Sequence, residues 1–172
     1  MEQVGNAKPQ PSSFILCHGR DCRIRTRVKL SGGEWGRVAS LFPAASARDE
    51  RQRIKKAIGM LEQMTGKKAG TSGDLGGTFD GAFSKGQMDC EDETMNTGVY
   101  LTMLENRKLL RFHRVAGRAH RGYFFNRWPH RAVQVEEKKS HKTFVVDSWF
   151  HDNGKPAEIV ALQDWENGWR PN

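Results

Sequence analysis

Residues 87–107, QMDCEDETMNTGVYLTMLENR, decide the arrangement of the chain because they read as one helix with an acidic start and an apolar face. Asp89 stands where an N-cap residue is expected, and Asp92 follows at the spacing of a capping box. Acidic side chains in the first turn complement the helix dipole. The pattern predicts a helix over residues 89–107, with an apolar face formed by Met95, Val99, Tyr100, Met103 and Leu104.

The segments on either side of this helix differ in their residue patterns. Upstream, seven glycines in residues 66–86 indicate a long loop. Further upstream the pattern predicts a strand and two helices, and downstream it predicts four strands. Helices followed by antiparallel strands indicate an α+β domain over residues 14–172, after a flexible tail of residues 1–13. The expected elements are a strand at 22–30, helices at 34–42 and 46–65, the second ended by Gly66, and strands at 109–115, 132–136, 143–150 and 158–162.

Length and composition fit one globular domain. The chain has 172 residues, of which 37% are hydrophobic and 28% charged. The longest uninterrupted apolar run, residues 14–17, is far shorter than a bilayer requires, so the sequence predicts no transmembrane segment.

The net charge of +8 is concentrated in one region. Residues 106–135 hold eight lysines and arginines and no acidic residue. Such a stretch is typical of a solvated basic face, or of a surface that attracts an anionic partner. The sequence carries no zinc-finger spacing, basic heptad helix or aromatic RNA-binding motif, which argues against nucleic acid as the partner.

The three cysteines fall into two environments. Cys17 and Cys22 enclose the short segment His-Gly-Arg-Asp, and Cys90 stands alone. A disulfide between Cys17 and Cys22 would indicate an oxidising compartment, either periplasmic or extracellular. Two buried thiols, or half of a metal site completed by His18, are the alternatives. Residues 1–10 are polar and contain no secretory core, so we expect any signal peptide to lie outside this sequence.

A nucleophile, a base and an orienting acid occur in a consistent order. Cys90 follows the expected N-cap, where backbone N–H groups favour a thiolate. His130 begins one expected strand, and Asp147 lies between valines and aromatic residues in the next. If the two strands are antiparallel neighbours, Asp147 can orient His130, which can then deprotonate Cys90. The alternatives are an inert buried thiol, a locally satisfied histidine and an aspartate that serves a turn.

The segment around Cys90 resembles the nucleophile helix of transglutaminase-like cysteine proteases. The resemblance lies in Asp-Cys-Glu-Asp-Glu at 89–93, Asn-Thr at 96–97, Tyr-Leu at 100–101 and Leu-Glu at 104–105, and the bacterial branch related to the periplasmic protease LapG is the most similar. It implies a papain-like core in which the nucleophile helix packs on an antiparallel sheet. It also implies the roles of nucleophile for Cys90, base for His130 and orienter for Asp147. The resemblance spans residues 87–149 and leaves the segment around Cys17 and Cys22 unassigned.

The same resemblance implies a calcium ion bound by Asp89 and Glu91 beside the nucleophile. Carboxylates around Cys90 should raise its pKa, and a bound cation would cancel that repulsion. The alternative is that these acids only complement the helix dipole. For the oxyanion, the backbone N–H of Cys90 is the first expected donor and the Gln87 side chain the second candidate, unless Gln87 only closes the loop before the helix.

Together these observations predict a thiol-dependent hydrolase that attacks an amide carbonyl of a protein or peptide and hydrolyses the resulting thioester. Peptide cleavage is favoured over cross-linking, and the chemistry itself requires no cofactor. The rival function is a non-catalytic binding module that holds an anionic partner through residues 107–131. In that module the contact residues, or simply core residues, would be Trp128, Trp149, Trp165 and Trp169.

Overall fold

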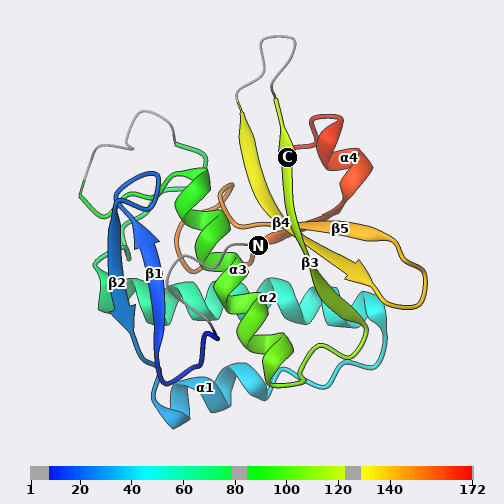
Figure 1. Ribbon diagram of the computed structural model, residues 1–172, viewed down its shortest axis with the longest axis horizontal. Helices are drawn as coiled ribbons and strands as arrows, with labels where there is room; N and C mark the ends of the chain where they lie inside the picture. Colours follow the sequence, from blue (N-terminus) through cyan, green and yellow to red (C-terminus); the bar gives the residue numbers. More distant parts are fainter. Residues whose placement is uncertain (1–7, 79–84, 123–128, 172) are drawn as a thin grey trace.

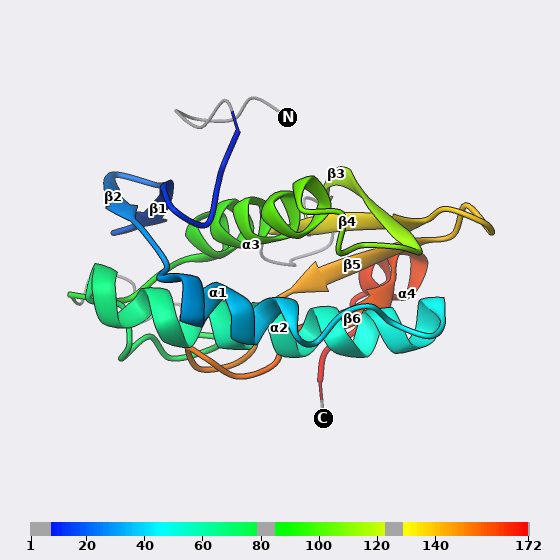
Figure 2. The ribbon, with the colours of Figure 1, turned by 90° about the horizontal axis from the view of Figure 1, so that it is seen from below.

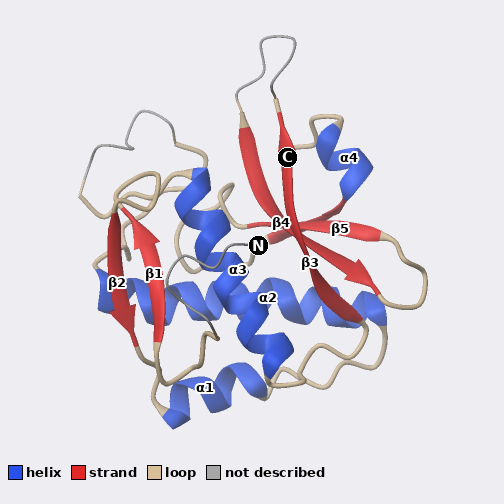
Figure 3. Cartoon of the chain, viewed as in Figure 1, coloured by secondary structure: helices blue, strands red, loops and turns tan. Residues whose placement is uncertain are grey.

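The computed structural model describes residues 8–78, 85–122 and 129–171, and these form an α+β fold with antiparallel sheets (Figure 3). The elements follow the expected order of a strand, helices and then a sheet, except that β1 pairs with the first expected strand to form a hairpin and a short helix follows the sheet. They are β1 (Phe14–His18), β2 (Ile24–Val28), α1 (Gly32–Ala39), α2 (Ala47–Ala69), α3 (Cys90–Asn106), β3 (His113–Arg121), β4 (His130–Glu137), β5 (Thr143–Asp147), β6 (Glu158–Ala161) and α4 (Leu162–Glu166).

Helix α3 lies between two antiparallel sheets. On one side is the β1–β2 hairpin, and on the other is a four-stranded sheet in the order β3-β4-β5-β6 (Figure 1). The helix packs mainly on β1 and β4, so its N-terminus and the start of β4 belong to the same region of the molecule. The expected packing of this helix on an antiparallel sheet is therefore present.

The long helix α2 forms the other side of the core. Figure 2 shows α1 and α2 lying together, with α3 and the sheet above them. The apolar stripe of α2 packs inward as its spacing predicts: Ile54, Ile58 and Leu61 are fully buried. They join residues of α3 and β4 in one hydrophobic cluster, which fixes α3 relative to the sheet.

The two long helices differ in how well the sequence predicts their ends. Asp89 caps α3, and its side chain and that of Asp92 form the reciprocal bonds of a capping box. The predicted end of α2 at Gly66 is wrong, because the helix continues to Ala69 and ends at Gly70, which has a positive φ of 78°. Gly66 lies within the helix, and its small size serves packing, because a Cβ there would lie 2.8 Å from the Asn153 side chain.

The strands are confirmed as a set but shifted at their ends. The third strand was predicted at residues 109–115, whereas β3 begins at His113 and runs to Arg121. Its pairing with the whole length of β4, including a bulge between Val115 and Gly117, sets these limits. The fifth strand ends at Asp147 instead of continuing to residue 150. Strand β1 and helix α4 were not predicted from the sequence.

The expected tail of residues 1–13 is described only from residue 8 onward. Pro11 is buried, and its carbonyl oxygen accepts a hydrogen bond from the Leu30 N–H over 2.8 Å. Packing against the hairpin therefore begins before Phe14. Among the described helices, none combines the length and the apolar character that a bilayer span requires.

Candidate active site

Cys90 is the first residue of α3, directly after the Asp89 cap. Its thiol is unpaired and partly buried. The backbone N–H of Arg131 hydrogen bonds to the thiol and lowers its pKa. Because Arg131 follows His130 on β4, this contact places the thiol beside the first residues of that strand.

His130 and Asp147 form a buried pair, as the strand order predicts. His130 Nε2 lies 2.7 Å from Asp147 Oδ2, and the two side chains are 5% and 2% exposed. The strand register explains why the His130 and Asp147 side chains lie together. Strand β4 begins at His130, but its pairing with β5 begins only at Val133 opposite Val146. The first residues of β4 pair with β3 but not with β5, and they lie beyond the end of β5, where Asp147 is the last residue.

Trp165, on α4, adds a third side chain to this pair. Its indole Nε1–H donates to Asp147 Oδ2 over 2.8 Å, and the tryptophan is fully buried. An indole nitrogen can only donate, so Oδ2 acts as an acceptor there. In the tautomer in which His130 donates Nε2–H to the same oxygen, the lone pair of the ring lies on Nδ1.

The second ring nitrogen of His130 has no partner. Nδ1 is buried and lacks a hydrogen bond within the described part of the chain, so it is not hydrogen bonded to the Cys90 thiol. The ring lies among aromatic groups, with centroids 4.8 Å from Trp149 and 5.5 Å from both Phe150 and Trp165. A cleft of about 390 Å³ opens beside it, lined by Gly77, Arg121, Gly122, His130, Trp149, Phe150, Glu166, Gly168, Arg170 and Pro171.

The thiol is neutral in this resting arrangement. Burial raises the pKa of Cys90 to about 11, and the nearby charges of Asp89 and Glu91 act in the same direction. The Arg131 backbone and side chain oppose these effects without outweighing them. The expectation that the helix start yields a thiolate does not hold here, whereas the expected effect of the flanking acids on the pKa is present.

Gln87 takes the loop-closing role that was the alternative to oxyanion binding. Its Oε1 accepts from the Leu75 N–H over 3.1 Å, and its Nε2 donates to the Gly73 carbonyl over 2.7 Å. The amide donor is thus used within the loop. The backbone N–H of Cys90 remains the donor expected at the helix start, where N–H groups have no intrahelical partner.

Asp89 and Glu91, the residues expected to hold calcium, bind protein groups instead. Asp89 accepts from the backbone N–H groups of Asp92 and Asp21. Glu91 places one oxygen 2.8 Å from Arg118 and the other 2.6 Å from Arg131. A carboxylate that already binds two guanidinium groups does not fit a calcium ligand. Calcium binding at Asp89 and Glu91 stays a prediction of the sequence resemblance.

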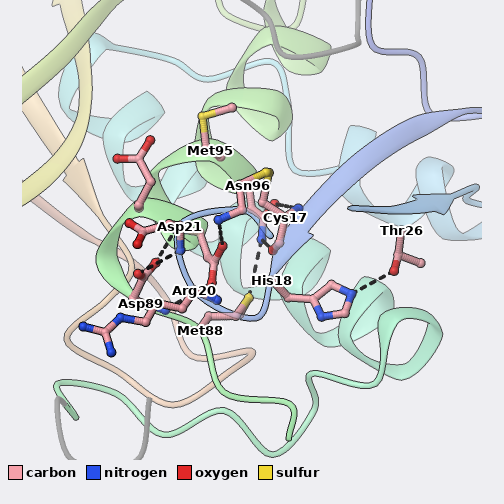
Figure 4. Close-up of a disulfide and its surroundings, with 12 residues drawn as sticks. Cys17, His18, Arg20, Asp21, Thr26, Met88, Asp89, Met95 and Asn96 are labelled. Atoms are coloured by element: carbon pink, nitrogen blue, oxygen red, sulfur yellow. Dashed lines mark hydrogen bonds between the residues drawn. A yellow bond between two sulfur atoms is a disulfide. The ribbon is translucent and has the colours of Figure 1, made fainter. Parts of the chain in front are cut away.

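The predicted disulfide between Cys17 and Cys22 is confirmed, and it closes the tip of the β1–β2 hairpin. Figure 4 shows this tip beside the start of α3, with Cys17 next to Asn96 and His18 directed toward Thr26. The Asn96 side chain accepts from the Cys17 N–H and donates to the Cys17 carbonyl, each over 2.8 Å. A disulfide of this kind fits an oxidising compartment.

The hairpin tip also binds the Asp92 carboxylate through its backbone. The N–H groups of Arg20 and Cys22 donate to the two oxygens of Asp92, each over 2.8 Å. Residues 19–22 all have positive φ, between 50° and 77°, which turns successive N–H groups toward one anion. The segment that the family resemblance left unassigned is therefore attached to the first turn of α3.

The arginines of the stretch 107–131 are largely committed to internal partners. Arg118 and Arg131 pair with Glu91, and Arg114 pairs with Glu136. Arg121 donates to the backbone carbonyls of Trp165 and Trp169. Trp165 is core, Trp149 and Trp169 are partly exposed, and Trp128 lies outside the described residues.

A group of buried carboxyls behind α3 was missed by the sequence analysis. Glu62 and Glu93 are 3% and 4% exposed, and both lie near Asp74. Burial raises the pKa of Glu62 to about 8 and that of Asp74 to about 6. Glu62 stands four positions after Ile58, on the inward face of α2, and this position was the signal that could have identified it.

The structure thus brings His130 and Asp147 together, places Cys90 beside them, and directs Gln87, Asp89 and Glu91 to other partners. Trp165 had no signal in the sequence, because its contact with Asp147 depends on how α4 returns to the sheet. No family model, curated protein or solved structure matches this chain.

Proposed function

We propose that the protein is a thiol-dependent hydrolase in which Cys90 attacks an amide carbonyl with His130 as its base. The observation that carries this proposal is the His130 ring: Nε2 is anchored to Asp147, while Nδ1 is buried without a partner in the described part of the chain. A buried nitrogen with an open lone pair is costly unless it is used, and the thiol of Cys90 lies next to the same strand start.

A second buried histidine, His113, differs from His130 in the partners of its ring nitrogens. His113 also pairs with a carboxylate, Glu50, over 2.9 Å, and both side chains are fully buried. Its other nitrogen, however, lies 3.2 Å from an Arg51 guanidinium nitrogen. The His113 pair therefore has both ring nitrogens occupied, which suits a structural role, whereas His130 keeps one nitrogen for chemistry.

The raised pKa of Cys90 indicates general-base attack rather than a preformed thiolate. When a carbonyl is seated, the thiol proton passes to His130 Nδ1 as sulfur bonds to the carbonyl carbon, and the C=O electron pair moves to oxygen. Asp147 and Trp165 stabilise the imidazolium through Nε2–H. The Cys90 backbone N–H donates to the oxyanion.

The second half of the reaction returns the site to its starting state. The oxyanion collapses, the C–N bond breaks, and Nδ1–H protonates the leaving amine, which leaves a thioester on Cys90. Water then gives its proton to Nδ1 and attacks the thioester, and the carboxylic acid leaves as the thiol is reprotonated. The aromatic cleft beside His130 is the proposed seat of the peptide or protein substrate.

The finer parts of the family resemblance belong to this proposal. A papain-like or transglutaminase-like core is supported by α3 packing on the antiparallel sheet and by the order of Cys90, His130 and Asp147. Location in the periplasm or outside the cell is supported by the disulfide.

Acetyl transfer from p-nitrophenyl acetate tests the proposal without knowledge of the substrate. We expect a burst of nitrophenol and an acetyl group on Cys90, identified by peptide mass spectrometry. Cys90→Ala should abolish the burst, and His130→Ala should reduce its rate by about 10²–10⁴-fold. Asp147→Asn should also slow it, because the amide no longer favours the Nε2–H tautomer.

The matched control is His141→Ala. His141 also pairs with a carboxylate, Glu136, over 2.7 Å, but its side chain is 74% exposed. Its removal should leave the burst unchanged. Acetylation of Cys90 at the same rate in the His130→Ala and His141→Ala variants would refute His130 as the base.

A further inference from the structure

The strand β2 has an edge that no other strand covers. It pairs only with β1, and in Figure 1 it lies on the outer side of the hairpin, with β1 between it and α3. An open strand edge offers unpaired N–H and C=O groups to any extended chain that reaches it. The contacts of Cys17 show which residues of β2 contribute these groups.

Cys17 directs both its N–H and its carbonyl to Asn96, away from β2. Its cross-strand partner is Arg25, so this pair is of the non-hydrogen-bonded kind, in which both residues turn their backbone groups outward. By the same alternation Arg27, opposite Ile15, also turns its N–H and C=O to the open edge. The structure gives the backbone groups of Arg25 and Arg27 no partner within the described part of the chain.

The side chains along this edge form a row of cations. Four exposed basic residues alternate on one face of the strand and its flanks, and we call them the β2 cation row: Arg23, Arg25, Arg27 and Lys29. Arg27 donates to the Ser13 hydroxyl. Within residues 8–78, 85–122 and 129–171, no ion pair includes a member of the row.

The opposite face of β2 carries an exposed apolar residue. Ile24 is 51% exposed, although its neighbours on that face, Thr26 and Val28, are increasingly buried. An added strand would therefore meet cations on one face and an aliphatic side chain on the other.

We propose that the open edge of β2 binds an extended acidic segment of a partner protein, which adds to the hairpin as a third, antiparallel strand. Two residues of this segment, two positions apart, would exchange backbone hydrogen bonds with Arg25 and Arg27. Residues paired across strands share a face, so these two positions should be Asp or Glu. The residue opposite Ile24, which neighbours the one opposite Arg25, lies on the other face and should be apolar, so acidic and apolar residues should alternate along the segment.

This surface is distinct from the stretch 107–131, and the proposal holds whether or not Cys90 is a nucleophile. In the stretch 107–131, Arg114, Arg118 and Arg131 already have carboxylate partners. The charge complementarity of an acidic strand is thus better met at β2.

Fluorescence anisotropy with a labelled Glu-Val-Glu-Val-Glu-Val peptide tests the proposal on the full chain carrying Cys90→Ala, so that hydrolysis cannot interfere. We expect saturable binding that weakens as salt increases. Arg25→Glu should weaken it about tenfold, because an attractive cross-strand pair becomes repulsive. Arg48→Glu, an exposed arginine on α2, is the matched control and should change the affinity little.

Two further measurements separate strand addition from general charge attraction. A peptide of the same composition with its glutamates and valines in separate blocks should bind at least about tenfold more weakly. In hydrogen exchange followed by NMR, the alternating peptide should slow exchange at the Arg25 and Arg27 amides. Equal binding of the block peptide, or unchanged exchange at both amides, would overturn the proposal. No binding at all would also overturn it, and would mean that the β2 cation row only protects the edge from self-association.

Discussion

Trp165 and His130 donate to the same carboxylate oxygen, Asp147 Oδ2, over 2.8 Å and 2.7 Å. Two donors on one buried oxygen hold the carboxylate in place and define which nitrogen of the imidazole carries the proton. The indole thus positions the proposed base through Asp147, although α4 follows Cys90 in the sequence only after the whole four-stranded sheet.

Trp165→Phe removes one of these donors and keeps an aromatic ring. We expect the free energy of unfolding to fall by about 1–3 kcal/mol, because a hydrogen bond to a buried carboxylate is lost. Urea denaturation measures this effect. Trp169→Phe is the control, since the Trp169 contact with Arg121 runs through its backbone carbonyl. A role in positioning predicts, in addition, that Trp165→Phe shifts the pH profile of the acetylation burst.

Alkylation of Cys90 should depend steeply on pH. The pKa of the thiol is raised to about 11, so the thiolate fraction increases roughly tenfold per pH unit between pH 7 and 10. Iodoacetamide labelling should follow this increase, with no plateau near neutral pH. A plateau below pH 8 would contradict the raised pKa and would indicate a preformed thiolate.

Glu91→Gln should accelerate that labelling at neutral pH. Glu91 raises the pKa of Cys90, and it also neutralises Arg118 and Arg131. Its replacement removes a negative charge and no longer neutralises the Arg131 guanidinium, which lowers the pKa of Cys90, and both changes favour the thiolate. Glu136→Gln provides the control, since Glu136 also binds an arginine but is not among the charges that affect Cys90. Equal labelling rates for these two variants would contradict the prediction.

The titration of Glu62 should lower the free energy of unfolding as the pH rises from about 4.5 to 8, whereas His18 and His120, whose pKa values burial lowers, act in the opposite direction below about pH 6.5. Burial raises the pKa of Glu62 to about 8, so the folded state keeps a proton that the unfolded state loses near pH 4.5. Between these values the folded protein binds more protons at Glu62, and through this group each rise in pH favours unfolding. Asp74 and Asp92, both raised to about 6, add to this loss below pH 6.

Glu62→Gln should flatten the pH dependence of stability between pH 6 and 8. The slope of unfolding free energy against pH should decrease in magnitude by up to about 1.4 kcal/mol per pH unit, the contribution of one proton. Glu34→Gln is the control, because the pKa of Glu34 is lowered and its titration acts only below pH 4.5. Parallel stability curves for the parent and Glu62→Gln above pH 6 would exclude this role of Glu62.

Asp92→Asn should loosen the hairpin from α3. Both carboxylate oxygens accept backbone N–H groups, but an asparagine offers one acceptor and turns an NH₂ group toward the other donor. We expect a loss of about 1–3 kcal/mol in the free energy of unfolding. Thermal denaturation of this variant and of Asp89→Asn, which keeps an effective N-cap residue, should show the larger loss at position 92.

The sequence predicted elements whose limits depend on local chemistry. The start of α3 is set by Asp89 and Asp92, and both residues are visible in the sequence. The end of α2 and the start of β3 depend on packing partners instead. Gly66 lies inside the helix as a packing glycine against Asn153, and β3 follows the extent of β4. No window of local sequence contains these partners.

In the candidate site, too, some features follow from the local sequence and others depend on contacts between distant segments. The pairing of His130 with Asp147 followed from the order of two adjacent strands, which the alternation of residues reveals. The roles of Gln87 and Glu91 depended on which loop or arginine reaches them in three dimensions. The pKa of the thiol likewise depends on burial, which a helix start alone does not determine.

The left-handed tip of the hairpin has a consequence for which substitutions the protein can tolerate. Arg20 and Cys22 hold Asp92 through main-chain N–H groups, so the contact depends on conformation and makes no demand on the chemistry of the side chain at position 20. Glycine or asparagine at position 20 adopts positive φ readily, whereas valine or isoleucine does not. Related chains that keep these hydrogen bonds to Asp92 should therefore exclude β-branched residues at position 20.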